Sequence, residues 1–288
     1  MKGAMTPPVP AQSRFVVHDD LNLHHLDWGN HGGHPVILVH GIRLHAHVWN
    51  NFARRFSDQL HILALDQRGH GDSGWGGADS YQLEDFYRDL RAVVTQRGLT
   101  RFTLIGHSLG GLVSMVYAHR RPEDLERLVL VDITAGLPEV APGTDLSRIS
   151  ETPPPQDFDS VESATAYLRR IMAMAPPDVV AESVAQGVRR TDTGAYTWKY
   201  DPALSQHRRP VPASMDLWGM VGAIPTPTLL QYGSHSRVVT PALAERMAAT
   251  MPRCSVERIE RAGHALFTDQ PDAFADSVRR FLFGPSLS

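Results

Sequence analysis

Three observations predict an α/β fold for this chain, with a mostly parallel sheet flanked by helices and one large insertion. Short apolar runs alternate with amphipathic stretches along the sequence, as expected for parallel strands joined by helices. The runs are apolar throughout rather than at every second position, which indicates strands buried on both faces. The region 136–212 breaks this rhythm and is too long and irregular to be a simple loop.

Eight strands are predicted. The segment 14–29 alternates apolar and polar residues around a turn at Asp19 and Asp20, which predicts an antiparallel hairpin at the edge of the sheet. Apolar runs predict the other six strands, at 35–39, 61–66, 101–106, 127–132, 225–233 and 254–260.

Helices are predicted between these strands and in the insertion. Apolar residues at three- and four-residue spacing predict a helix over about 83–94, a second covers 110–120 before Pro122, and a third follows from about 272 to 283. The proline-rich insertion has only two modest helical patterns, around 160–174 and 178–189.

The insertion follows the end of the predicted strand 127–132, at the edge of the sheet where α/β proteins bind ligands. It is therefore interpreted as a lid. We expect a core formed by 14–135 and 213–288, a lid over 136–212 and a disordered leader over 1–13.

Composition restricts the possible partners. A formal net charge of −3 gives no electrostatic reason to expect nucleic acid, and no run approaches the ~20 apolar residues of a membrane span. Cys254 is the only cysteine, so the chain cannot form an internal disulfide bond. We expect a cytoplasmic protein that acts on a small molecule, without a cofactor or a bound metal ion.

A nucleophile motif lies between the predicted strand 101–106 and the helix that follows it. Gly106, His107, Ser108, Leu109 and Gly110 form a G-x-S-x-G sequence in a strand–turn–helix setting. Glycines two residues before and after the serine permit the sharp, strained turn that exposes its hydroxyl. The helix that starts directly after Ser108 directs backbone N–H groups at an oxyanion that forms beside the serine.

The chain resembles the α/β-hydrolases in four segments. They are GHSLGG at 106–111, the HG pair at 40–41 after a buried strand, DQRGHGDSG at 66–74 and AGHALFTDQP at 262–271. The segments occur in the order typical of that family, and the likeness covers about 14–283, with 136–212 matching only as a variable cap. The resemblance is specific for the fold and the nucleophile and uninformative about the substrate.

The resemblance implies a triad in the chain order serine, acid, histidine. Ser108 is then the nucleophile and His264 the base, and the backbone N–H groups of Ile42 and Leu109 form the oxyanion hole.

The acid departs from the commonest pattern of the family. Most relatives carry it in the loop after the penultimate strand, where this chain has GSHSRVV and Ser236 occupies the acid's place. A hydroxyl supplies no negative charge to stabilise an imidazolium. Asp132 ends the strand after the nucleophile's helix, as the acid does in some esterases, lactonases and dehalogenases, and is the predicted triad acid. Asp66 is interpreted as part of a structural turn held together with Arg68.

The other histidines are interpreted mainly as structural. His40, His70 and His107 are expected to belong to a hydrogen-bonded framework, whereas Arg43, His45 and His47 could line the pocket. His24, His25, His31 and His34 gather near the predicted hairpin without a metal-binding motif, and a solvated hairpin is the favoured explanation.

The predicted function is hydrolysis of a carboxylic ester, lactone or thioester through an acyl-enzyme on Ser108. Aromatic and methionine side chains of the lid would suit a small, moderately apolar substrate, although packing of the lid explains each of them equally well. Two alternatives stay open: a carbon–carbon bond hydrolase or lyase on the same fold, and a relative that binds a ligand without catalysis.

Overall fold

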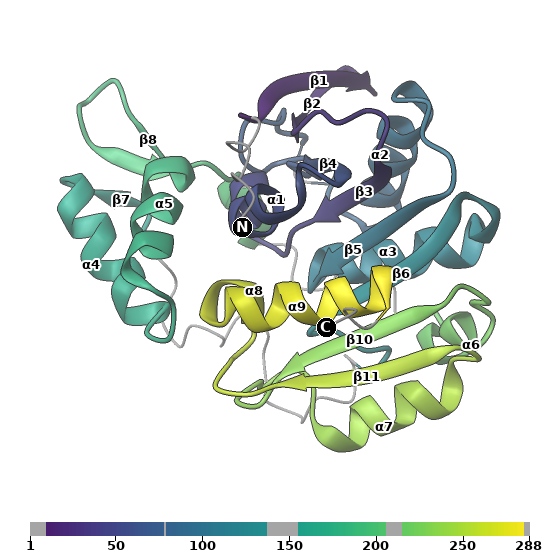
Figure 1. Cartoon of the computed structure of the whole chain (residues 1–288). Coiled ribbons are helices and arrows are strands. Elements are labelled where there is room, and N and C mark those ends of the chain that lie inside the picture. Colours follow the sequence, from purple (N-terminus) through teal and green to yellow (C-terminus); the bar gives the residue numbers. More distant parts are fainter. Residues whose placement is uncertain (1–9, 78, 137–154, 206–214, 285–288) are drawn as a thin grey trace, which may run out of the picture.

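The computed structural model describes residues 10–77, 79–136, 155–205 and 215–284. Its main feature is an eight-stranded sheet in the order β1-β2-β4-β3-β5-β6-β10-β11 (Figure 1). The strands are β1 (Gln12–His18), β2 (Leu21–Asp27), β3 (His34–Val39), β4 (Leu60–Leu65), β5 (Phe102–His107), β6 (Leu125–Val131), β10 (Thr228–Gly233) and β11 (Cys254–Ile259). Strands β1 and β2 pair antiparallel to each other and β2 antiparallel to β4, whereas all other pairs are parallel. The predicted fold class is confirmed.

Helices cover both faces of the sheet (Figure 1). One face packs against α2 (Leu83–Gln96), α3 (Leu109–Arg120), α6 (Leu217–Gly222) and α7 (Pro241–Thr250), and the other against α1 (Asn50–Phe56), α8 (Leu266–Asp269) and α9 (Pro271–Phe283). Alternate residues of β3 enter the two cores, with Ile37 on one side and Leu38 on the other, and both are fully buried. This burial on both faces explains the continuous apolar runs.

The inserted segment forms a small layer of its own beside the sheet (Figure 1). It contains α4 (Val161–Ile171), α5 (Pro177–Gly187) and a three-stranded sheet of β7 (Asp157–Phe158), β9 (Tyr196–Trp198) and β8 (Val188–Arg190). Phe158, Leu168 and Val184 are buried in a separate apolar cluster between these elements. The two helical patterns predicted in the insertion correspond to α4 and α5, whereas its strands are too short to leave a sequence pattern.

Polar contacts join the insertion to the core. Glu182 on α5 accepts a hydrogen bond of 2.8 Å from Asn50 Nδ2 and forms an ion pair with Arg54, both residues of α1. Farther along the chain, the backbone N–H of Gly71 donates to the carbonyl oxygen of Lys199, and Lys199 Nζ lies 2.7 Å from Asp72 Oδ1. These contacts attach the insertion at two separate points beside the carboxyl edge of the sheet.

Several boundaries differ from the expected ones. Gln12 and Ser13 belong to β1, so the expected disordered leader does not extend to residue 13, and residues 1–9 lie outside the described part of the chain. The expected limits of the lid fall at or beside the undescribed ranges 137–154 and 206–214, and they stay a prediction. The short helices η1 (Ala46–Trp49), α1, α6, α7, α8, η2 (Pro122–Asp124) and η5 (Pro202–Ser205) were not predicted.

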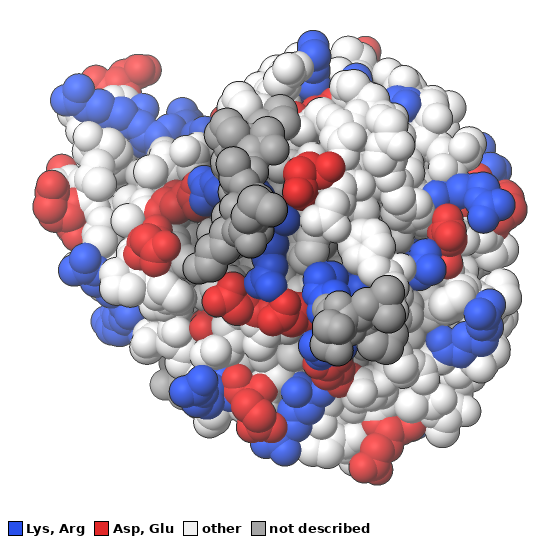
Figure 2. Space-filling view, in the orientation of Figure 1, with Lys and Arg blue, Asp and Glu red and all other residues white. Residues whose placement is uncertain are grey.

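Two features of the described residues concern membranes and surface charge. Among the residues described, no helix has the length and apolar character needed to cross a membrane. Figure 2 shows basic and acidic side chains interspersed over the face in view, without a broad patch of one sign among the residues described there.

Candidate active site

Ser108 occupies a strained turn between β5 and α3. Its backbone has φ 51° and ψ −115°, a conformation that costs a residue with a side chain about 1–3 kcal/mol. A Cβ atom on Gly106 would overlap the carbonyl oxygen of Gly110, and one on Gly110 would overlap the carbonyl oxygens of Val39 and His40. The glycines therefore allow β5, α3 and the end of β3 to approach one another. The collisions that they avoid are with backbone atoms and with Ser114 Oγ rather than with Ser108.

The loop after β3 lies directly against this turn. A Cβ atom on Gly41 would come within 3.1 Å of Ser108 Cβ, so the two chain segments are in contact. The N–H of Gly110 donates to the carbonyl oxygen of His40 over 3.1 Å. Within the described chain, the N–H groups of Ile42 and Leu109 have no hydrogen-bond acceptor, which leaves both available to a ligand.

Asp132 and His264 are joined by a short hydrogen bond. His264 lies in the loop between β11 and α8, and its Nδ1–H donates to Asp132 Oδ2 over 2.6 Å. Asp132 directly follows β6, is fully buried and has φ 51°, while the imidazole is 21% exposed. The backbone N–H of Gly233 donates to the other carboxylate oxygen over 3.2 Å. The carboxylate predicted from the sequence therefore contacts the predicted base.

Ser236 contributes to the same cluster, a role that sequence reasoning missed. Its hydroxyl donates to Asp132 Oδ2 over 2.7 Å and accepts hydrogen bonds of 3.0 Å from the backbone N–H groups of Val238 and Val239. Because those two N–H groups occupy the lone pairs of the oxygen, the hydroxyl proton points at the carboxylate. The serine at the position where an acid was expected thus helps to hold the Asp132 carboxylate.

His107 connects the loop of His264 to the turn that contains Ser108. Its Nε2–H donates to the backbone oxygen of His264 over 3.0 Å, and the two imidazole rings lie 4.6 Å apart. Burial and the neighbouring His264 lower the pKa of His107 well below its ordinary value, so this imidazole is neutral. Ser108 Oγ and His264 Nε2 make no hydrogen bond to any described residue.

The turn that contains Asp66 is structural, as predicted, but its partners differ. Asp66 is buried and accepts hydrogen bonds from His24 Nδ1 at 2.7 Å, from the N–H of Ala46 at 2.6 Å and from the N–H of Asp72 at 3.0 Å. Arg68 forms a two-pronged ion pair with Asp89 on α2 instead of with Asp66. Through its bond to Ala46, Asp66 holds the loop that follows Gly41 and Ile42 in place.

The expected framework histidines are hydrogen-bonded in the core. His40 donates from Nδ1 to the carbonyl oxygen of Gly41 over 2.7 Å and accepts from the N–H of Gln67, and its burial lowers its pKa to about 3. His70 donates to the carbonyl oxygen of Arg68 over 2.9 Å, and burial lowers its pKa to about 4. Both side chains are therefore neutral structural groups.

Side chains of the insertion approach the site at one described point. The Met174 methyl group lies 3.0 Å from the position that a Cβ atom on Gly263 would occupy, beside His264, and Met174 is 44% exposed. In contrast, Phe158, Tyr167 and Trp198 pack against one another inside the insertion. His45, which could have lined the pocket, is buried against Gly187 of α5.

Comparison with known proteins identifies the family. Residues 36–277 match the model of the alpha/beta hydrolase family. The chain is 31% identical over 270 residues to the esterase Rv0045c of Mycobacterium tuberculosis, covering 89% of this chain and 85% of the relative. It is 28% identical over 252 residues to the sn-1-specific diacylglycerol lipase ABHD11 of Mus musculus, covering 86% and 80%. The crystal structure of E-2-(acetamidomethylene)succinate hydrolase has the same fold, with a TM-score of 0.84 at 23% identity and coverage of 94% of this chain and 99% of that one. The chain belongs to the alpha/beta hydrolase family.

Proposed function

We propose that this protein is a serine hydrolase that cleaves a carboxylic ester, lactone or thioester of a small, moderately apolar substrate. The observation that carries the proposal is the 2.6 Å hydrogen bond between Asp132 and His264, formed in the loop that His107 ties to the strained Ser108 turn. A buried carboxylate that accepts from Nδ1 leaves the lone pair on Nε2 of the same ring, as a general base requires.

The proposed reaction proceeds in two steps. Ser108 Oγ attacks the carbonyl carbon while His264 Nε2 takes the hydroxyl proton, and Asp132 stabilises the resulting imidazolium. The N–H groups of Ile42 and Leu109 stabilise the oxyanion, a contribution worth about 100- to 1000-fold in rate for each donor. The imidazolium then protonates the departing alcohol or thiol. Water, deprotonated by the same imidazole, hydrolyses the acyl-enzyme and releases the acid.

Ester chemistry is favoured by the nucleophile and by the names of relatives. A serine at the turn forms an acyl-enzyme with a carbonyl substrate, and two relatives of this chain are called an esterase and a diacylglycerol lipase. The exposed Met174 beside the base supplies an adaptable apolar surface for part of the substrate, which agrees with a moderately apolar acyl or alcohol group.

A fluorophosphonate probe tests the nucleophile. We expect stoichiometric labelling of the wild-type protein and none of Ser108→Ala, with Ser73→Ala as a matched control that keeps Ser108. A folded wild-type protein that does not react would contradict the proposal and favour a relative that binds a ligand without catalysis.

A panel of p-nitrophenyl esters, lactones and thioesters of graded chain length tests the substrate class. We expect kcat/KM to rise with chain length up to an optimum and then to fall. Labelling by the probe without turnover of any member of the panel would retain the serine nucleophile and reject this substrate class, which would direct the search to carbon–carbon bond hydrolysis.

A further inference from the structure

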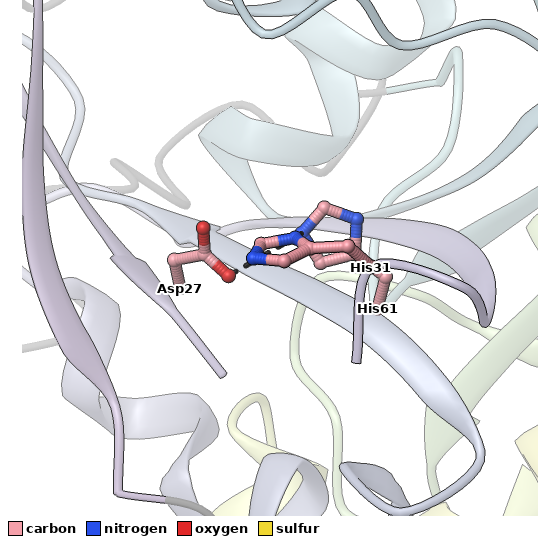
Figure 3. Close-up of side chains that lie close together, drawn as sticks. All are labelled: Asp27, His31 and His61. Carbon is pink, nitrogen blue, oxygen red and sulfur yellow. Dashed lines mark hydrogen bonds and ion pairs between the residues drawn. The ribbon is translucent and has the colours of Figure 1, made fainter. Parts of the chain in front are cut away.

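Three side chains that are distant from Ser108 converge at the opposite edge of the sheet. Asp27 ends β2, His61 lies near the start of β4, and His31 lies in the connection between β2 and β3. His61 Nε2 lies 3.3 Å from Asp27 Oδ1 and 3.1 Å from His31 Nδ1. Figure 3 shows the Asp27 carboxylate facing the two imidazole rings. The donor atoms of all three residues lie within 4.8 Å of one another.

These separations match the spacing of ligands around a small transition-metal ion. A tetrahedral ion with bonds of about 2.0–2.1 Å holds neighbouring ligand atoms about 3.3–3.4 Å apart. Two imidazole nitrogens and one carboxylate oxygen are donors that suit Zn²⁺ and similar divalent ions, with the fourth position left to water.

Without an ion, the three side chains cannot form hydrogen bonds at both of their short contacts. Both short contacts converge on His61 Nε2, which carries at most one proton. That proton can form a full hydrogen bond with Asp27 or with His31, but not with both. An ion at the centre replaces the two competing contacts by three bonds, one from each side chain.

The surroundings hold the ligands in position. Asp27 Oδ1 accepts a hydrogen bond of 2.9 Å from the N–H of Gly29, and Oδ2 accepts one of 2.8 Å from Arg97. The Arg97 guanidinium pairs with the Asp27 carboxylate, which favours the anionic form. Asp27 is buried together with His61, whereas His31 is exposed and provides access from solvent.

A second cluster, formed by His24, Asp66 and Asp72, does not offer the same arrangement. The Asp66 oxygens already accept hydrogen bonds from Ala46, His24 and Asp72, and His24 Nε2 lies 2.8 Å from the Ser13 hydroxyl. The atoms of this second cluster that could bind an ion therefore already form hydrogen bonds that hold the loop in place.

We propose that Asp27, His31 and His61 bind one divalent transition-metal ion, for which Zn²⁺ is the probe. The site lies at the amino end of β4, about 17 Å along the strand from the carboxyl edge that carries Ser108. The ion joins β2, β4 and the turn after β2, and it takes no part in ester hydrolysis. This departs from the absence of a metal expected from the sequence.

Zinc-dependent stability of the untagged full-length protein tests the site. We expect one Zn²⁺ to bind per chain and the Tm to rise by about 5 °C at a hundredfold excess over Kd. His31→Ala removes an exposed ligand, so it should fold normally and lose the rise. His119→Ala removes an exposed histidine on α3 and should keep it. Visible absorption of bound Co²⁺ should follow the same pattern among the three proteins.

Two results would overturn the proposal: no shift for the wild-type protein, or a shift for His31→Ala equal to that of the wild-type protein, which would place the ion elsewhere. Probe labelling of Ser108 and turnover of esters by His31→Ala should equal those of the wild-type protein. Failure of the metal site is therefore distinguishable from failure of the proposed function.

Discussion

Replacing Asp132 by asparagine tests the proposed acid with little change of shape. The native carboxylate accepts three hydrogen bonds, from Gly233 N–H, Ser236 Oγ and His264 Nδ1. Asparagine has one accepting oxygen and one donating nitrogen, so it cannot accept on both sides. Either side chain orientation therefore breaks part of the arrangement.

The orientation determines the size of the loss. If the amide nitrogen faces His264, it donates to Nδ1 and forces the proton onto Nε2, which can then no longer take a proton from Ser108. A wrong tautomer of this kind costs about 10⁴-fold in kcat, or about 5 kcal/mol. If the nitrogen faces the N–H of Gly233 instead, the tautomer survives but the charge is lost. Loss of a charge-assisted hydrogen bond of about 3 kcal/mol then gives about 100-fold.

The assay is the hydrolysis of the best ester in the panel, with thermal unfolding to show that the variant is folded. We expect Asp132→Asn to lower kcat by 100-fold or more. Asp269→Asn is a matched control, because Asp269 accepts the N–H of Gly263 in the same loop and an amide oxygen can keep that bond of 2.8 Å. A loss below about tenfold for a folded Asp132→Asn would remove Asp132 from the mechanism.

Three further outcomes follow from the contacts. Ser236→Ala deletes the hydroxyl that donates to Asp132, and initial rates should show kcat/KM lower by about 10- to 100-fold. Burial keeps His70 neutral and lowers its pKa to about 4. The contribution of neutral His70 to the free energy of unfolding is therefore fully present above the unfolded pKa of about 6.5, and it is lost as the pH falls from there towards 4. Urea unfolding at pH 7 and pH 5 should therefore show a loss of stability on acidification that is smaller for His70→Asn than for the wild-type protein by about 2 kcal/mol. Gly71 has φ 56° and a Cβ there would overlap the Asp66 carboxylate, so thermal unfolding should show that Gly71→Ala loses about 3 kcal/mol or more.

The central strands could be predicted from sequence because their burial is nearly complete. All six residues of β4 and of β5 are buried, and such runs leave a clear signal. Helix α7 was missed although Thr240 caps it and Pro241 starts it, because its apolar positions are few. Strands β7, β8 and β9 of the insertion are two or three residues long and depend on contacts within the insertion, which no local pattern encodes.

The histidines near the first hairpin show where local reasoning failed. A solvated hairpin was expected there, but His24 and His25 are buried, and His24 is bonded to Asp66 across 42 residues of sequence. His31 meets His61 only because β2 and β4 are neighbours in the sheet. Strand order determines both contacts, and the spacing of residues along the chain does not reveal it.

The proposed position of the acid follows from the geometry of two neighbouring strands. Because β6 and β10 are parallel partners, Asp132 N–H bonds to the carbonyl oxygen of Gln231, and the loops after both strands reach the same side of His264. His264 Nδ1 has one proton to donate, so the site needs one carboxylate, and either strand end can supply it. Two carboxylates within hydrogen-bond distance in this buried place would repel each other, and one would be protonated. A serine at 236 avoids that conflict and adds a hydrogen-bond donor to Asp132. The residue that seems to break the triad in the sequence is therefore the one that fits an acid directly after β6.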